Sequence, residues 1–419
     1  MNTTRRIASY VLLVSVYVLT LLVAVVGHAI PRRRWKPTGR IMVTGTFHNP
    51  NWYLSHITPL TRSGVKEVIL VIDEPLQPLD KVRFVCPPRW LARLISRAGA
   101  KCVWTVVVGL RCRPDMYMGY HIFPSAVSAL CAARLLNRPA CYQDTSGPTE
   151  LQGGGWRAEN RVLGGLGNPS PLIESLVRRV VREFDLVVVR GTRAAAFLRE
   201  IGYRKNLAII TGSVQTPERW YRHDERDCDL VFIGRLTECK RPDRFISVVA
   251  GVARQISEIT AIVVGDGPEM MAVRQQAQTM GVEDCVTFLG TREDVSELLC
   301  RSKVYVLTSR SEGLSIAMIE AMANGAVPVV SDVGDLCDLV QDGFNGFVLD
   351  EDDIEGFCNH VVQMLGDEAV WRECSLAAMK AATQYSSVEA VSNKWRDCLR
   401  KIIMGESHPR NDAVRSCSI

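Results

Sequence analysis

The chain has 419 residues, of which 47% are hydrophobic and 23% are charged, and its formal net charge is +5. This length is more than one ordinary hydrophobic core serves, so it predicts two domains. The composition excludes a chain that is disordered throughout, and so mild a charge gives no indication of a nucleic-acid-binding protein.

The N-terminus begins with an uncharged apolar run, IASYVLLVSVYVLTLLVAVV, at 7–26. A helix of this length can cross the hydrocarbon core of a bilayer. Two arginines precede the run, and basic residues follow it at 32–34 and 36. This excess on the C-terminal side predicts a single-pass membrane anchor with the domains that follow it in the cytoplasm. A cleaved signal peptide remains an alternative, because small residues follow the run.

The 14 cysteines are scattered singly, without a Cys-x-x-Cys pair. Zinc sites need clustered ligands, and disulfide scaffolds are usually short chains dense in cysteine. The pattern therefore favours reduced thiols that pack as small hydrophobic side chains in a reducing compartment.

Strands and helices alternate in the first half of the chain. Strands are predicted at Arg40–Thr44, Val68–Ile72, Val82–Cys86, Val103–Val108, Pro139–Tyr142, Asp185–Val189 and Leu207–Ile210. Helices are predicted between several of them, at Trp90–Ala98, Ala126–Leu136, Pro171–Glu183 and Arg193–Ile201. Short apolar strands that alternate with helices indicate a parallel sheet covered on both faces.

The alternation restarts after a polar segment at 219–229. Strands are predicted at Asp229–Ile233, Ala261–Val264, Val286–Leu289, Val304–Leu307, Val327–Val330 and Phe347–Leu349, and a last helix at Val388–Ile403. Two such series predict two doubly wound α/β domains. Because open parallel sheets bind ligands beyond the carboxyl ends of their strands, the loops at those ends are the places to look for a site.

Three of these loops in the second half carry suitable groups. FIGRLTECKRPDRF places Arg235 and Lys240 between a strand and a helix, where two cations suit a diphosphate, although exposed cations near helix starts are common. VVGDGPE contains Gly265, which suits either close approach to a ligand or a tight turn. VTFLG ends a strand at Leu289, which either passes along a nucleobase or is an ordinary strand end.

The most specific loop is VYVLTSRSEGLSIAMIEAMANGAVPVVS, which leads from a strand into a helix that we expect to begin near Leu314 or Ser315. Glu312 lies in the loop and Glu320 inside an otherwise apolar helix. A carboxylate buried there needs a hydrogen-bonding partner, and ribose hydroxyls would serve. The backbone N–H groups of Gly313, Leu314 and Ser315 stand at the helix N-terminus, which favours a phosphate.

These four segments, in this order, resemble the signature of glycosyltransferase family 4, including its Glu-x7-Glu pattern at Glu312 and Glu320. The resemblance is close over about 229–365 and looser over 40–210. It implies the GT-B fold, in which two doubly wound Rossmann-like domains face a central cleft, here with an N-terminal transmembrane helix. It also implies a retaining enzyme that uses a nucleotide-sugar donor and needs no metal and no cofactor.

The resemblance also implies roles for individual residues. Arg235 and Lys240 would bind the donor diphosphate and stabilise the leaving nucleotide, Glu312 would hold the transferred sugar, and Glu320 the ribose. Catalytic roles are thus expected for Glu312, Arg235 and Lys240. Donor binding is expected for Glu320, Gly313, Leu314, Ser315, Gly265, Leu289 and Gly45.

The acceptor half is less well defined. Gly45 follows the first strand, where the family has a glycine-containing loop near the donor phosphates, and His48 is interpreted as a turn residue. His121 resembles a histidine of the family's first acceptor-domain motif. Where the family commonly has another histidine, this chain has Asp144 within CYQDTSGPTELQGGGW. The expected partners are the nucleotide sugar, a lipid-linked or glycan acceptor and a membrane.

The expected domains follow from the GT-B fold. They are 1–39, membrane anchor and basic flank; 40–218, acceptor-side domain; 219–386, nucleotide-sugar-binding domain; 387–404, a helix that crosses back to the first domain; and 405–419, a disordered tail.

Other functions are weighed against this assignment. A metal-dependent transferase would use an Asp-x-Asp site, but the two matches, 227–229 and 350–352, read as solvated charge. A nicotinamide oxidoreductase would need Gly-x-Gly-x-x-Gly, and Met270 stands where the third glycine is required. A non-catalytic, membrane-tethered nucleotide-sugar-binding scaffold or sensor is the main alternative.

Overall fold

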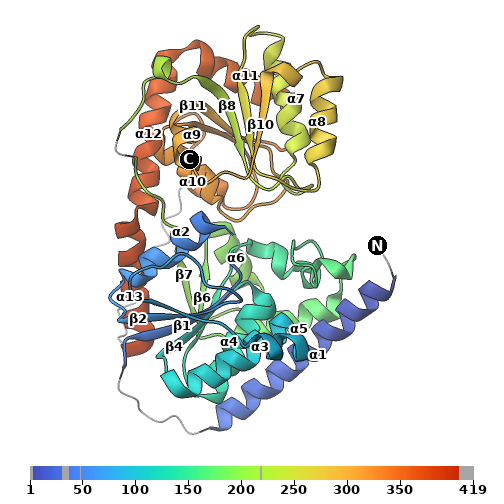
Figure 1. The fold of residues 1–419 in the computed structure, drawn as a ribbon, viewed down its shortest axis with the longest axis vertical. Coiled ribbons are helices and arrows are strands. Elements are labelled where there is room, and N and C mark those ends of the chain that lie inside the picture. The colour runs from blue at the N-terminus through green and yellow to red at the C-terminus, as the bar shows by residue number, and fades with distance from the viewer. Residues whose placement is uncertain (1–2, 31–36, 48, 218, 405–419) are drawn as a thin grey trace.

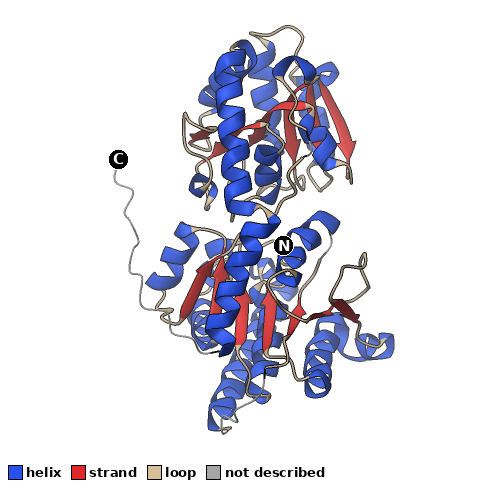
Figure 2. Cartoon of the chain, turned by 90° about the vertical axis from the view of Figure 1, so that its left-hand side faces the viewer, coloured by secondary structure: helices blue, strands red, loops and turns tan. Residues whose placement is uncertain are grey.

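The computed structural model describes residues 3–30, 37–47, 49–217 and 219–404. Two parallel α/β sheets lie one above the other in Figure 1, each with its own core. Figure 2 shows helices packed against the strands of both sheets. The prediction of two doubly wound α/β domains is therefore confirmed.

The N-terminal sheet has seven parallel strands in the order β3-β2-β1-β4-β5-β6-β7. The strands are β1 Arg40–Thr44, β2 Glu67–Val71, β3 Val82–Val85, β4 Met116–Tyr120, β5 Ala140–Gln143, β6 Leu186–Val189 and β7 Asn206–Ile209. The helices are α2 Pro50–Thr61, α3 Arg89–Cys112, α4 Val127–Leu135, α5 Pro171–Glu183 and α6 Thr192–Glu200. The strand order reverses between β1 and β4, which is where such sheets bind ligands.

The C-terminal sheet has six parallel strands in the order β10-β9-β8-β11-β12-β13. The strands are β8 Cys228–Ile233, β9 Ala261–Val264, β10 Val286–Gly290, β11 Ser302–Leu307, β12 Val327–Ser331 and β13 Phe347–Leu349. The helices are α7 Pro242–Ala253, α8 Met270–Thr279, α9 Val295–Cys300, α10 Ile316–Ala323, α11 Ile354–Gly366 and α12 Glu368–Ser386. Here the order reverses between β8 and β11, and the loops after both strands face the other domain.

The chain passes between the domains twice. It leaves the first sheet after β7 and returns through α13 (Val388–Met404), which packs on α2, with Val391 and Trp395 inside the N-terminal core. Figure 1 shows α12 and α13 running down one side of both domains. The two crossings are joined at one point, because the Val214 N–H donates to the Ser386 carbonyl at 2.8 Å.

The N-terminal apolar run forms a single helix, α1, at Thr3–Ala29. It is long and apolar enough to cross a membrane, although the core helix of a soluble protein or a signal sequence can have the same properties. In the structure α1 lies along the N-terminal domain and contacts α4 and α5 (Figure 1).

One element of the first half was predicted wrongly. Residues 103–108 are not a strand but the second half of α3, which continues past a break at Ile95 and Ser96. Thr105 and Val108 are buried while Val103 is 43% exposed, so the segment has the one-sided burial of a helix, and tertiary packing against α4 overrides β-propensity. The strand that takes this place in the sheet is β4, and its sequence, MYMGY, contains no β-branched residue.

Candidate active site

Four loops at the carboxyl edge of the C-terminal sheet carry the predicted donor residues. Arg235 and Lys240 follow β8, Gly265 follows β9, Leu289 and Gly290 end β10, and Glu312 follows β11. Because all of these strands are parallel, their loops meet at the same edge of the sheet, facing the N-terminal domain.

Lys240 and Glu312 form the central ion pair of this edge. Lys240 Nζ donates to Glu312 Oε1 at 2.5 Å, and Ser309 Oγ donates to the same oxygen at 2.6 Å. The Glu312 side chain is only 7% exposed. Desolvation by burial lowers the pKa of Lys240, but the Glu312 carboxylate more than offsets this, and the net pKa is raised. The ammonium group is thus held charged at the edge of the cleft.

The N-terminus of α10 follows directly after Glu312. Ser315 is its N-cap, with Oγ accepting from the Met318 N–H at 3.3 Å, so the helix begins one residue later than predicted. Within the described part of the chain, the backbone N–H groups of Gly313, Leu314 and Ser315 donate to no other group. These donors and the helix dipole are available to a phosphate.

Glu320 lies inside α10, more than one helical turn after the N-cap Ser315. Among the described residues no group hydrogen-bonds to its carboxyl. Burial alone raises the pKa of Glu320 to about 7. A carboxyl in this environment gains stability from hydroxyl donors, which a ribose carries.

The glycines of the second loop have a packing role. Gly265 has φ +133°, and a Cβ there would lie 1.9 Å from the Gly234 carbonyl oxygen. A Cβ at Gly267 would lie 2.2 Å from the Leu236 carbonyl oxygen. The loop after β9 therefore supports the loop that carries Arg235. Leu289 is half-buried and packs against the hydrophobic core of this edge.

Arg235 points across to the other domain. Its guanidinium Nη1 lies 3.0 Å from Glu159 Oε2, and its side chain is 65% exposed. The pair borders a cleft of about 700 Å³ between the domains. The N-terminal domain lines this cleft with Trp156 and Arg157, whose guanidinium lies 4.5 Å from the centre of the Trp156 ring.

His121 follows β4 in a left-handed conformation, with φ +61°. Its Nδ1 hydrogen-bonds to Glu150, and its ring stacks on Trp52 at 6.0 Å between centroids. Desolvation by burial lowers the pKa of His121, but the Glu150 carboxylate more than offsets this effect, so the net pKa is raised.

The sequence analysis did not identify Glu150, although it lies in the segment quoted around Asp144. Its carboxylate is 4% exposed and also accepts from the Ile122 N–H at 2.8 Å and the Tyr142 hydroxyl at 3.0 Å. Burial raises the pKa of Glu150, but His121 and these donors lower it to a net value below normal. Nothing in the local sequence indicates that these partners come together.

Asp144 directly follows β5 and is 1% exposed. Burial, followed by the nearby Glu150 charge, raises its pKa well above normal. The neighbouring Arg190 is also buried and donates to the Ile210 carbonyl at 2.5 Å. Asp144 therefore lies below the surface of the acceptor half.

Gly45 follows β1 at the same edge of the N-terminal sheet. A Cβ there would lie 2.8 Å from the Phe47 ring and 3.3 Å from Tyr120, so the aromatic packing around the loop requires a small residue. His48 lies outside the described residues.

The structure brings the two half-sites face to face. Thr149 Oγ1, beside Glu150, lies 3.1 Å from Ser311 Oγ, beside Glu312. A Cβ at Gly313 would lie 2.5 Å from the Thr145 carbonyl oxygen, so the backbones of the two domains touch there. The loop of Glu312 and Gly313 thus meets the segment that contains Glu150, and of the predicted donor residues Arg235 lines the cleft.

The two Asp-x-Asp matches take part in ion pairs. Asp229 lies 2.9 Å from Lys303 Nζ, Asp227 pairs with Arg301, and Asp352 pairs with Arg244. No cluster of three or more potential metal ligands occurs among the described residues. Every described cysteine is a free thiol.

Residues 227–367 match the family model described as glycosyl transferases group 1. The chain is 31% identical over 293 residues to N-acetyl-alpha-D-glucosaminyl L-malate synthase of Bacillus anthracis, covering 66% of this chain and 72% of the relative. It is 32% identical over 142 residues to UDP-Gal:alpha-D-GlcNAc-diphosphoundecaprenol alpha-1,3-galactosyltransferase of Escherichia coli, covering 33% and 36%.

Solved structures share the fold. HepE of Anabaena in complex with UDP-glucose superposes with a TM-score of 0.66 at 18% identity, covering 86% of this chain and 99% of that one. Sucrose-phosphate synthase from Thermosynechococcus elongatus gives a TM-score of 0.69 at 16% identity, covering 88% and 100%.

Proposed function

Because the chain belongs to the glycosyl transferases group 1 family, it is a glycosyltransferase that uses a nucleotide-sugar donor, and we propose that it transfers the sugar with retention of anomeric configuration. The observation that supports this most is the Lys240–Glu312 pair beside the N–H groups of 313–315 and the Glu320 carboxyl, which have no hydrogen-bond partner among the described residues. Together with Arg235 they offer two cations, backbone N–H donors and a carboxyl to one nucleoside diphosphate.

In the proposed reaction the acceptor hydroxyl attacks the anomeric carbon on the face that the diphosphate leaves. The bond from the anomeric carbon to the phosphate oxygen breaks, the glycosidic bond forms, and the hydroxyl proton passes to the departing phosphate. Lys240, Arg235 and the α10 amides stabilise the negative charge that grows on the diphosphate. Glu312 then holds sugar hydroxyls, and Glu320 the ribose. These cations and amides take the place of a metal ion, so the proposed reaction needs none.

We propose a lipid-linked or glycan acceptor. The E. coli relative is named for a substrate on diphosphoundecaprenol, and α1 is apolar enough for a membrane-associated protein. The basic residues after α1 favour placement of the domains on the cytoplasmic side. The single-pass topology stays a prediction.

The first test is donor binding and slow hydrolysis across UDP-, GDP- and ADP-sugars in the presence of a chelator, with Glu320→Ala and Lys240→Ala beside the wild type. We expect one donor to bind and both variants to weaken it. Strict dependence on added Mn²⁺ would contradict the metal-free mechanism. Binding of a donor without any turnover, with acceptor panels included, would favour the non-catalytic sensor instead.

A further inference from the structure

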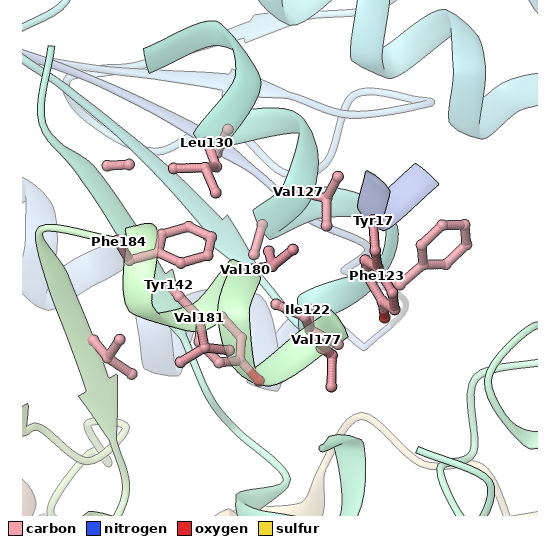
Figure 3. Close-up of a cluster of buried hydrophobic side chains, with 14 of the residues drawn as sticks. Tyr17, Ile122, Phe123, Val127, Leu130, Tyr142, Val177, Val180, Val181 and Phe184 are labelled. Carbon is pink, nitrogen blue, oxygen red and sulfur yellow. The ribbon is translucent and has the colours of Figure 1, made fainter. Parts of the chain in front are cut away.

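Helix α1 packs on the N-terminal domain through a single stripe of residues. The buried positions are Ser9, Leu13, Tyr17, Thr20, Ala24 and Gly27. They recur every three or four residues, so they form one face of the helix. Figure 3 shows Tyr17 among side chains of the domain core, beside Phe123 and Ile122. This stripe makes α1 part of the domain core.

Small residues bring the backbones close at both ends of this contact. A Cβ at Gly27 would lie 2.7 Å from the Arg134 Cβ and 2.9 Å from its carbonyl oxygen. At the other end, a Cβ at Gly165 would lie 2.3 Å from Ser9 Oγ. Such close approach is typical of tightly packed helix contacts.

Polar contacts hold both ends of α1 as well. Arg5 donates to the Arg161 carbonyl at 3.3 Å, and Arg6 to the Leu166 carbonyl at 3.1 Å. Near the C-terminal end, His28 Nε2 lies 3.6 Å from Glu183 Oε2. At about 1.5 Å per residue, a helix of this length is roughly 40 Å long, and it follows the domain surface over that length.

The outward side of α1 is apolar too. Ile7 and Leu19 are each 60% exposed, and Val25 is 68% exposed. No charged side chain occurs from 7 to 26. A surface helix in water normally turns polar residues outward, so this face requires an apolar cover.

A bilayer cannot surround α1 while the helix keeps these contacts. The neighbouring α5 carries Arg179 and Arg182 on its exposed side, and placing them in hydrocarbon is unfavourable. We propose that α1 stays docked on the N-terminal domain and that its outward face sinks into one leaflet of a bilayer, parallel to the membrane plane. The protein is then held at the surface by an in-plane helix and not by a membrane span.

The charge around α1 favours a lipid surface as the occupant of this face. Arg5 and Arg6 lie at its start, and the sequence has four further basic residues at 32–34 and 36. Basic residues at the ends of an apolar interfacial helix bind anionic headgroups while the apolar side chains enter the acyl region.

The first test measures flotation of the full chain with vesicles of phosphatidylcholine containing a minority of phosphatidylglycerol. Leu19→Glu combined with Leu22→Glu changes only outward side chains, so the fold is expected to persist, which thermal melting checks. We expect vesicle partitioning to fall at least about 10-fold. Met271→Glu, at a position that is 76% exposed in the other domain, is the matched control and should leave partitioning unchanged.

The second test distinguishes a docked helix from a spanning one. Thr20 Oγ1 lies 3.8 Å from Cys131 Sγ, so Thr20→Cys places two thiols together only while α1 is docked. Diamide oxidises both thiols to a disulfide and is itself reduced. In the vesicle-bound protein we expect a crosslinked peptide between position 20 and Cys131, found by mass spectrometry, and none for the outward-facing control Leu19→Cys.

Each other outcome would overturn the proposal. Vesicle binding without the crosslink would mean that α1 leaves the domain and spans the bilayer. Unchanged binding by the double variant would place lipid contact elsewhere. The wild type could also fail to bind vesicles and form a dimer, with the double variant monomeric. That result would assign the apolar face to contact with a second copy of this chain.

Discussion

The donor and acceptor halves of the cleft are built on equivalent sheet edges but hold their charges in different ways. On the donor side, Lys240 and Glu312 pair at the cleft edge, while Glu320 and three backbone N–H groups have no described partner. On the acceptor side, His121 is fixed by a buried Glu150 that already has several donors. The donor half therefore keeps hydrogen-bonding capacity for a ligand, whereas the acceptor half uses its capacity to fix one ring.

The largest effect should come from the donor half. Lys240→Met removes the cation that faces the diphosphate and leaves Glu312 buried without its partner, so kcat/KM should fall about 10²–10³-fold. Steady-state kinetics with the donor found in the binding panel measure this. Lys303→Met breaks a similarly buried pair with Asp229 at the opposite edge of the same sheet. It should lower stability but change kcat/KM less than about 3-fold; equal losses in both variants would mean that Lys240 acts through the fold alone.

An effect of intermediate size should follow from Glu150→Gln, since Glu150 is a positioning residue for His121. We expect kcat to fall about 10-fold, and a basic limb of the pH–rate profile to move to lower pH, because the raised pKa of His121 depends on the carboxylate.

The same pair makes a prediction for stability. The raised pKa of His121 gives stability that is lost as pH rises through that pKa, and the lowered pKa of Glu150 gives stability that is lost as pH falls through it. The loss of unfolding free energy in Glu150→Gln should therefore be greatest between about pH 4.5 and 6.5. Glu183→Gln, in the more exposed pair with His28, is the control. An unshifted pH–rate profile in Glu150→Gln would refute the positioning role.

Glu320→Gln should have a smaller effect that differs between the free and the bound protein. The pKa of about 7 lies above the ordinary value, so the ionised carboxyl destabilises the free protein as pH rises from about 4.5 to 7. The variant should be more stable by about 1–2 kcal/mol above pH 7, yet bind the donor about 10-fold more weakly. Chemical denaturation and titration calorimetry measure the two changes, with the exposed Glu297→Gln as control. Tighter donor binding would exclude the ribose role.

The smallest effect concerns the contact between the halves. Arg235 pairs with Glu159 while its side chain is largely exposed. Exposed pairs contribute little, so Glu159→Gln should free Arg235 and tighten donor binding by no more than about 3-fold. Titration of the nucleotide diphosphate measures this, and weaker binding would show that Glu159 itself contacts the ligand.

The same contrast explains what the sequence predicted and what it did not. The predicted donor residues of the C-terminal domain lie in loops after successive strands and in the helix that follows β11, so their order in the chain carries the pattern. The acceptor site needs His121 and Glu150, which come from separate segments and meet only through the packing around β4 and β5. β4 itself was missed because MYMGY is short, contains no β-branched residue and is buried at every position, so it shows no alternation of apolar and polar residues.

The joined crossings between the domains restrict how the enzyme can admit its substrates. Val214 bonds to the Ser386 backbone, and Thr211 Oγ1 lies 3.1 Å from Ser386 Oγ, so the two connecting segments move as one. The domains also meet away from these segments, since Asp335 accepts from the N–H groups of Arg193 at 2.8 Å and Ala194 at 3.1 Å. Opening the cleft then means breaking contacts such as Thr149–Ser311 and Arg235–Glu159, while the hydrogen bonds of Val214 and Thr211 to Ser386 persist. The loops of the two domains would then return to the same relative position each time the cleft closes.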